Sequence, residues 1–505
     1  MDVLRTKPVE HSLADAEEPR GRLRRSLGAI QLTVIGIGVI VGTGIFVLTG
    51  EAAGTVAGPS IAISFVMAAV VCALAGLCYA EFASVVPVAG SAYTFSYSTL
   101  GELVAWIIGW DLILELALGA ATVASGWSQY LQVVLTSAPW HLHPPAWVFA
   151  DHHNVAAAAI VLALSGLLCL GIRISSAVNG GIVAIKLAII LLVIVAGVTF
   201  IHTGNYHPFI PPSGAKPAPG GSSETTMLQE LGGAPGAFGV GGIFSGAALV
   251  FFAFIGFDIV ATNAEETRRP QRNVPIGIFA SLGICALLYV AVSLVVTGMV
   301  KYNHIDVKAP LATAFTSVGQ STIGTIVAYG ALAGITSVIL VLLMGQSRVF
   351  FAMSRDRLLP PVFSAVSERF RTPYRTTIVT GIVVAAVSFV FPLKTLAELV
   401  NIGTLFAFAL VSIGVIVLRR TRPDLPRPFR VPLMPVVPIL SVLASVWLML
   451  NLQTTTWVRF GIWMAIGLIV YFVYSHRSSR LARERPAGRP AEQRPRDAAA
   501  LPPRS

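Results

Sequence analysis

An apolar stretch near the start of the chain, Ile35–Phe46, carries glycines at positions 36, 38, 42 and 44. The surrounding segment is long enough to cross a bilayer, which takes roughly 20 residues. Each glycine weakens a helix by ~1 kcal/mol relative to alanine, so a helix that served only as an anchor would not need them. A helix that unwinds in mid-membrane offers N–H and C=O groups to a polar ligand, as broken transporter helices do. The stretch therefore favours a transporter, although glycine also allows membrane helices to pack closely.

The composition indicates a membrane protein with many spans. Of 505 residues, 55% are hydrophobic and 12% charged, and the mean hydropathy is +0.77, whereas soluble domains are about 25% charged. The four cysteines lie in apolar segments and are interpreted as small core residues. Apolar runs predict twelve spans, near 28–48, 59–84, 102–133, 154–171, 178–201, 242–263, 274–299, 323–352, 375–392, 396–418, 433–451 and 455–475.

The basic residues indicate the orientation of these spans. With the N-terminus inside, 29 of the 35 Lys and Arg residues fall in cytoplasmic segments and five fall outside. Cytoplasmic loops of membrane proteins are enriched in Lys and Arg, so we expect both termini in the cytoplasm. The net charge of +11 then reflects orientation, and we expect no nucleic-acid partner.

A second interrupted segment, Phe251–Asp258, contains Gly256 and belongs to the sixth span. The first and sixth spans occupy corresponding positions if the protein consists of two five-helix halves. Inverted repeats with helices broken at matching places bind substrate between them, near the midplane. Unwound backbone suits an α-amino acid, because a half-helix N-terminus attracts a carboxylate. The free carbonyls of a half-helix C-terminus attract an ammonium.

Charged residues inside the spans are candidates for ion coupling. Lys186 stands alone in the apolar fifth span, where a lysine costs ~2.5–3.5 kcal/mol to insert. An apolar environment favours a neutral amine, so Lys186 could carry a proton or replace a sodium ion. The alternative is a structural lysine paired with a carboxylate or with backbone carbonyls.

Two carboxylates are the leading proton partners. Glu115 follows Asp111 by four residues, so both lie on one helix face, and Glu115 is the deeper of the two. Asp258 ends the sixth-span motif, where its alternative role is to cap backbone freed at the break.

The sequence contains no phosphate-binding loop, no HExxH motif and no convincing Ser/His/Asp set, so we do not expect an enzyme. We also expect no cofactor and no metal site.

These residues together resemble the cationic amino acid transporter branch of the amino acid–polyamine–organocation superfamily, particularly its bacterial members. The resemblance covers nearly all of residues 25–475. It rests on the segments Ile40–Gly50, Tyr79–Phe82, Pro87–Tyr93, Phe251–Glu266, Arg348–Asp356, Leu399–Leu405 and Thr456–Phe460.

The resemblance implies an all-α membrane protein with twelve transmembrane helices. These form a five-plus-five inverted repeat, with helices 1 and 6 broken and two further C-terminal helices. The implied parts are a cytoplasmic tail (1–26), the first repeat (27–203), an extracytoplasmic loop (204–241), the second repeat (242–420), the last two spans (421–476) and a basic cytoplasmic tail (477–505).

The resemblance also implies the site. The substrate carboxylate would meet the backbone of Thr43, Gly44 and Ile45. The amino group would meet carbonyls near Ile40 and at Phe252, Ala253 and Ile255. In bacterial relatives a lysine of the fifth span takes the sodium position of sodium-coupled relatives, which matches Lys186. Proton coupling follows, with Glu115 and Asp258 as partners.

The function expected is permease transport of L-amino acids across a bacterial cytoplasmic membrane, as a monomer in the lipid bilayer. Proton-coupled symport by alternating access is the first hypothesis, with cationic amino acids as the class that the family name suggests. The alternatives are an amino acid or polyamine exchanger, in which Lys186 is structural, and an amino acid sensor.

Overall fold

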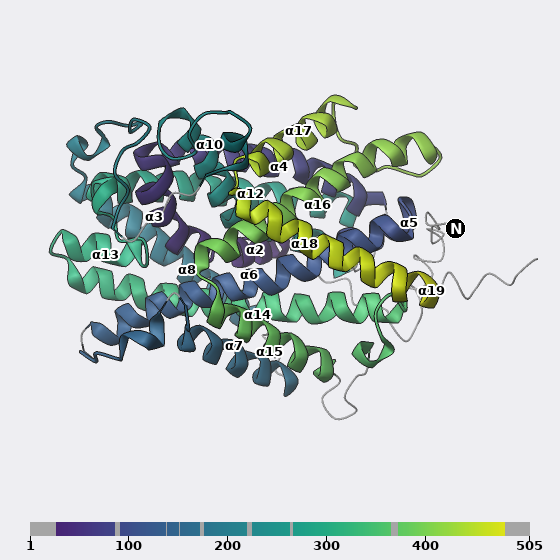
Figure 1. Cartoon of the computed structure of the whole chain (residues 1–505), viewed down its shortest axis with the longest axis horizontal. Coiled ribbons are helices and arrows are strands. Elements are labelled where there is room, and N and C mark those ends of the chain that lie inside the picture. The colour runs from purple at the N-terminus through teal and green to yellow at the C-terminus, as the bar shows by residue number, and fades with distance from the viewer. Residues whose placement is uncertain are drawn as a thin grey trace, which may run out of the picture.

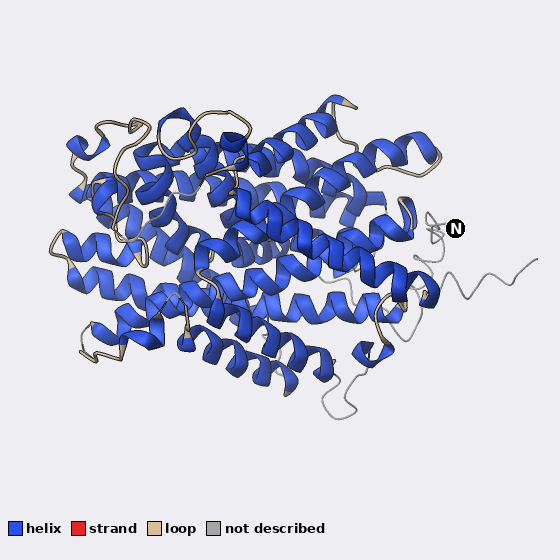
Figure 2. Cartoon of the chain, viewed as in Figure 1, coloured by secondary structure: helices blue, strands red, loops and turns tan. Residues whose placement is uncertain are grey.

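The computed structural model describes residues 27–85, 91–137, 139–150, 152–171, 176–219, 225–262, 266–364 and 372–479. The tail expected over 1–26 and most of the tail over 477–505 lie outside these residues. Helices dominate the part of the chain that is described (Figure 2). Its β pairing consists of two isolated bridges, Leu27 with Thr267 and Thr226 with Gln453.

The helices follow one another along the described part of the chain. Those of the first half are α2 (Ala29–Ile40), α3 (Thr49–Ala52), α4 (Ile61–Val85), α5 (Ser91–Thr99), α6 (Glu102–Thr136), α7 (Val155–Cys169) and α8 (Ser176–Gly197). Those of the second half are α9 (Met227–Glu230), α10 (Gly239–Val250), α11 (Phe257–Thr262), α12 (Pro270–Met299), α13 (Pro310–Ser317), α14 (Ser321–Arg355), α15 (Tyr374–Val390), α16 (Leu393–Thr421), α17 (Val436–Leu450), α18 (Thr454–Val470) and α19 (His476–Ser478).

Eight helical segments of the described chain are long and apolar enough to cross a membrane. Four shorter apolar helices, α2, α7, α15 and α17, accompany them. One of the eight, Gly44–Val85, turns at Gly58, where φ is +62°. It therefore contains the second part of the first predicted span and the whole of the second. Each of the twelve predicted spans coincides with a helix or with consecutive helical segments.

The helices pair across the two halves of the chain. In the first set of pairs, α4 packs against α12, α6 against α14 and α7 against α15. In the second set, α8 packs on α12 and α14, while α16 packs on α4 and α6. The bundle is elongated, with α3 and α13 at one end and α5 and α19 at the other (Figure 1).

A buried carboxylate fastens the loop between α16 and α17 to the end of α4. Glu81 is 1% exposed and accepts hydrogen bonds from Arg419 Nε at 2.8 Å and from the Val431 backbone N–H at 2.7 Å. Arg427 Nε lies 3.7 Å from the same carboxylate. Two guanidinium groups and one backbone donor thus offset the desolvation of a single buried charge.

Replacing this carboxylate is expected to destabilise the fold. In Glu81→Gln the two arginines lose their counter-charge, at a cost on the order of 3 kcal/mol, and the thermal unfolding midpoint in detergent should fall. The matched control is Asp424→Asn, since Asp424 forms an exposed pair with Arg422 at 3.4 Å and exposed pairs contribute little. Equal midpoints for the two variants would contradict the role given to Glu81.

Candidate functional site

Helix α2 stops in the middle of the first apolar stretch. Val41 adopts an extended conformation (φ −75°, ψ 97°), and its N–H closes the last turn on the Ile37 carbonyl. A π-helical segment, Gly44–Leu48, begins three residues later and leads into α3. The carbonyls of the last turn of α2 therefore lack the donors that a continuous helix would supply. The glycine-rich stretch is an interrupted helix, as its sequence predicts.

The second interruption lies between α10 and α11. The helix tightens into a 3₁₀ turn over Phe251–Phe254, and Ile255 is extended (φ −62°, ψ 135°). Gly256 follows with φ +120°, a conformation that L side chains rarely adopt. The prediction of a break in the Phe251–Asp258 segment is confirmed.

The two interruptions touch each other. A Cβ atom added to Gly44 would lie 2.3 Å from Ala253 Cα, and one added to Gly256 would lie 2.6 Å from Val39 Cγ1. Close approach of two backbones in an apolar environment requires glycine at the point of contact. Residues more than 200 positions apart in sequence thus form one unit of irregular backbone.

Side chains from neighbouring helices donate hydrogen bonds to backbone carbonyls at the two breaks. The Tyr289 hydroxyl of α12 donates to the Ile40 carbonyl at 2.9 Å, and the Tyr130 hydroxyl of α6 donates to the Phe46 carbonyl at 2.7 Å. On the other broken helix, Asn401 Nδ2 of α16 donates to Ala248 and Leu249 at 2.8 and 3.0 Å. Buried backbone groups need such partners where water is absent.

Lys186 binds another carbonyl of the first broken helix. It is fully buried on α8, and its Nζ donates to the Gly38 carbonyl at 2.6 Å. Its alkyl chain passes Gly334 of α14, where an added Cβ would lie 2.9 Å from Lys186 Cγ. In the described part of the chain no carboxylate forms an ion pair with it. The expected structural partner of this lysine was either a carboxylate or a backbone carbonyl, and the structure shows a backbone carbonyl.

The predicted carboxylates gather in a second place. Glu115 of α6 and Asp258 of α11 are both buried and close enough to repel each other, and Asp111 joins them. Asp258 follows Gly256 by two residues and lies in the first turn of α11. It therefore stands at the break as well as in the acidic group. Both oxygens of Asp111 are buried without a hydrogen-bond partner among the described residues.

The remaining predicted site residues line the two breaks. Thr43 Oγ1 donates to the Val123 carbonyl at 3.3 Å, so its side chain points to α6. The Ile45 N–H bonds the Gly42 carbonyl at 3.2 Å. The Ile255 N–H donates to the Phe252 carbonyl, also at 3.2 Å. The Phe252 carbonyl, which is predicted to bind the substrate ammonium, therefore already accepts one hydrogen bond from the protein backbone. A carbonyl has two lone pairs and can accept a second donor.

Sequence reasoning missed Tyr289, Tyr130 and Asn401. In sequence, a tyrosine in an apolar span cannot be distinguished from an ordinary core residue. The signal that could have indicated its role is that a buried hydroxyl needs a hydrogen-bond acceptor. Asn401 lies in one of the segments that carry the resemblance, and a polar residue in a span is a functional signal by itself.

Paired broken helices in a bundle of apolar helices are typical of membrane transporters for small polar solutes. Residues 27–474 match the amino acid permease family. The methylthioribose transporter of Bacillus subtilis (strain 168) is 44% identical over 95% of this chain and 99% of its own length. The branched-chain amino acid permease BcaP of the same organism is 46% identical over the same shares. The vacuolar cationic amino acid transporter 2 of Arabidopsis thaliana is 37% identical over 84% of this chain and 64% of its own. The chain belongs to the amino acid permease family.

Gly256 is expected to tolerate no side chain. In Gly256→Ala the new methyl group meets Val39 and the backbone is held at φ +120°, at a cost of about 1–3 kcal/mol. Thermal unfolding in detergent should begin at a lower temperature, and uptake of amino acid into proteoliposomes should fall. Gly283→Ala is the control, because nothing lies within 4 Å of a Cβ at that position. Unchanged stability and uptake in Gly256→Ala would show that the break does not require glycine.

Proposed function

We propose that the protein is a proton-coupled symporter of L-amino acids in a bacterial cytoplasmic membrane. The observation that carries the proposal is the contact between the two broken helices, with Lys186 bound to one of them at Gly38. The substrate carboxylate binds the backbone of Thr43, Gly44 and Ile45, where it replaces the Gly42 carbonyl as the acceptor for the Ile45 N–H. The substrate ammonium binds carbonyls of Ile40 and of the Phe252–Ile255 turn. Glu115 and Asp258 are the proton partners in this mechanism.

Lys186 couples the proton to helix movement. Its protonated amine donates a charge-assisted hydrogen bond, which is roughly twice as strong as a neutral one, to a carbonyl in the last turn of α2. Loss of the proton weakens this bond and releases α2 from α8. Alternating access then follows from the movement of α2 relative to the rest of the bundle.

The topology in this proposal is twelve membrane crossings, with both termini in the cytoplasm and a five-plus-five inverted repeat. The pairing of the helices supports the repeat. If each half is counted from its broken helix, α8 and α16 are the fifth members, and each packs on the second and third members of the other half. Such reciprocity is expected when two halves are related by a two-fold axis.

Neutral branched-chain amino acids are the substrate class that we favour, and cationic amino acids are the alternative. The branched-chain permease named above resembles this chain over almost the full length of both proteins. Val338 of α14 faces the first break, where its Cγ2 would lie 3.2 Å from a Cβ added to Gly42, which supports an apolar wall for the substrate side chain. The nearby Lys186 ammonium disfavours a second cation.

The test is uptake of labelled L-leucine, L-alanine and L-arginine into liposomes that hold the purified protein. Concentrative uptake should require an inward proton gradient and should disappear in Lys186→Met, while the exposed control Lys216→Met should retain it. Leucine uptake that exceeds arginine uptake would support the neutral class. Uptake that needs preloaded amino acid and ignores the gradient would instead establish an exchanger, with Lys186 structural.

A further inference from the structure

Asp111 is the one acid of the described chain whose two carboxylate oxygens are both buried without a hydrogen-bond partner. Other buried carboxylates of this structure have donors. Arginine side chains hold Glu81, and hydroxyl groups donate to Glu102 and to Asp356. A charged carboxylate without a partner is very costly to bury, and a group in that position takes up a proton instead. The surroundings of Asp111 therefore suit a carboxyl group that holds a proton.

Asp111 is tightly enclosed between α6 and α16. Its side chain is fully buried. A Cβ atom added to Gly403 of α16 would lie 2.6 Å from Asp111 Oδ1, so any side chain at position 403 would occupy the space of the carboxyl group. The absence of a side chain at Gly403 leaves the room that the Asp111 carboxyl group takes up.

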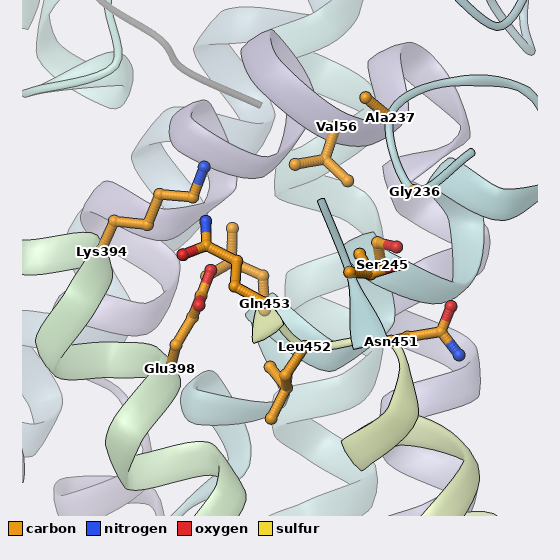
Figure 3. A pocket seen from close by; sticks show the side chains of 11 residues that line it. Val56, Gly236, Ala237, Ser245, Lys394, Glu398, Asn451, Leu452 and Gln453 are labelled. Atoms are coloured by element: carbon orange, nitrogen blue, oxygen red, sulfur yellow. The ribbon is translucent and has the colours of Figure 1, made fainter. Parts of the chain in front are cut away.

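A buried hydroxyl elsewhere in the bundle shows how water can replace a missing protein partner. Ser245 of α10 also lacks a hydrogen-bond partner among the described residues, but it lines a small cavity (Figure 3). The cavity has a volume of about 30 Å³, and a single water needs roughly 10–15 Å³, so water can bond the Ser245 hydroxyl there. Asp111 does not line this cavity and packs against Gly403 instead.

Asp111 lies between the two proposed proton partners and one end of the bundle. Glu115 follows it by one turn on the same face of α6, which is a rise of about 6 Å along the helix. Helix α6 begins at Glu102, directly after α5, and α5 lies at the end of the bundle that carries α19 (Figure 1). In the proposed topology this end faces the cytoplasm, so Asp111 is closer to the cytoplasm than Glu115.

The titratable groups near Asp111 are acids and a phenol. Tyr79 of α4 is 2% exposed, and the charges of Asp258, Glu115 and Asp111 all act on its hydroxyl. Within the described residues, α14 and α16 bring no charged side chain to Asp111, although both helices pack on α6. A proton is therefore the positive charge that can neutralise Asp111 in this closed bundle.

Helix α5 covers the part of α6 that leads from Asp111 to the cytoplasmic end. A Cβ atom added to Gly109, two residues before Asp111, would lie 3.0 Å from Tyr93 Cδ2 of α5. The Tyr93 hydroxyl donates to the Asp356 carboxylate at the end of α14, at 2.8 Å. While this contact holds, Asp111 remains buried and its proton has no access to water from this end.

We propose that Asp111 is the last proton carrier before the cytoplasm, which accepts the proton of Glu115 and releases it to water when α5 moves away. The proton passes from the carboxyl group of Glu115 to the carboxylate of Asp111 and leaves Glu115 charged. When the end closes again, burial makes the charged form of Asp111 costly and draws the next proton from Glu115. The inference rests on the proposed function, because an exchanger moves no net proton.

The test compares net transport with exchange in liposomes that hold the purified full chain and a pH-sensitive dye. The variants are Asp111→Asn, a neutral group of the same size, and Asp111→Ser, whose smaller side chain can bond a carbonyl one turn earlier in α6. The exposed acid gives the control, Asp424→Asn. The substrate is the better transported of L-leucine and L-arginine.

Both Asp111 variants should lose proton-driven uptake and keep exchange. Concentrative uptake and the acidification that accompanies it should fall about a hundredfold, which is a usual effect of removing a positioned proton donor or acceptor. Exchange of external labelled substrate for internal unlabelled substrate should stay near the wild-type rate, because it requires no net release of protons. The wild type and Asp424→Asn should show both activities.

Each other result overturns the inference in a recognisable way. Unchanged acidification in either Asp111 variant would show that no acid is needed at this position, while proton-coupled transport itself stands. Loss of exchange together with net uptake, or loss of the folded protein in both variants, would assign the carboxyl group to binding or to structure. If the wild type shows uptake without acidification, the proposed proton coupling fails and this inference fails with it.

Discussion

The fold depends on the requirement that backbone polar groups find partners where no water can supply them. A continuous membrane helix meets this requirement by itself, and a broken helix cannot. Both breaks in this protein are therefore surrounded by side chains with a donor at the right place. Lys186 binds Gly38, Tyr289 binds Ile40 and Asn401 binds two carbonyls of α10. Each of these donors comes from a different helix, so the breaks connect α8, α12 and α16.

Much of this architecture could be predicted from the sequence. Glycines inside an apolar span reduce the stability of the helix, which is explained by a break in the helix or by a close contact with a neighbour. Gly44 and Gly256 each lie at a break and each make a close contact. The isolation of Lys186 in its span marked it as functional or structural. What the sequence could not give was its partner, because a backbone carbonyl carries no sequence signal. The same holds for Tyr289, whose role depends on an acceptor almost 250 residues away.

The number of apolar helices was harder to predict than their positions. Three of the expected spans are helices of only 15 to 17 residues, namely α7, α15 and α17. The helix α2 forms only the first part of another span, whose second part continues through a turn at Gly58 into the next span. Hydropathy detects apolar length, whereas the end of a helix depends on φ at single residues. The acidic group is another feature of tertiary packing, since Asp111 and Glu115 share a helix face but Asp258 reaches them only through the fold.

The contact between Gly44 and Ala253 has a consequence for how a solute can be selected. At their present separation no atom fits between these two backbones. In the proposed site, a solute that binds between them would therefore act as a spacer that holds them apart. Part of its binding free energy goes into that separation, and its apparent affinity is reduced accordingly. A molecule that contacts only one of the two segments gains nothing from holding them apart. Such a site therefore selects solutes that bridge both broken helices, rather than solutes that bind tightly to only one of them.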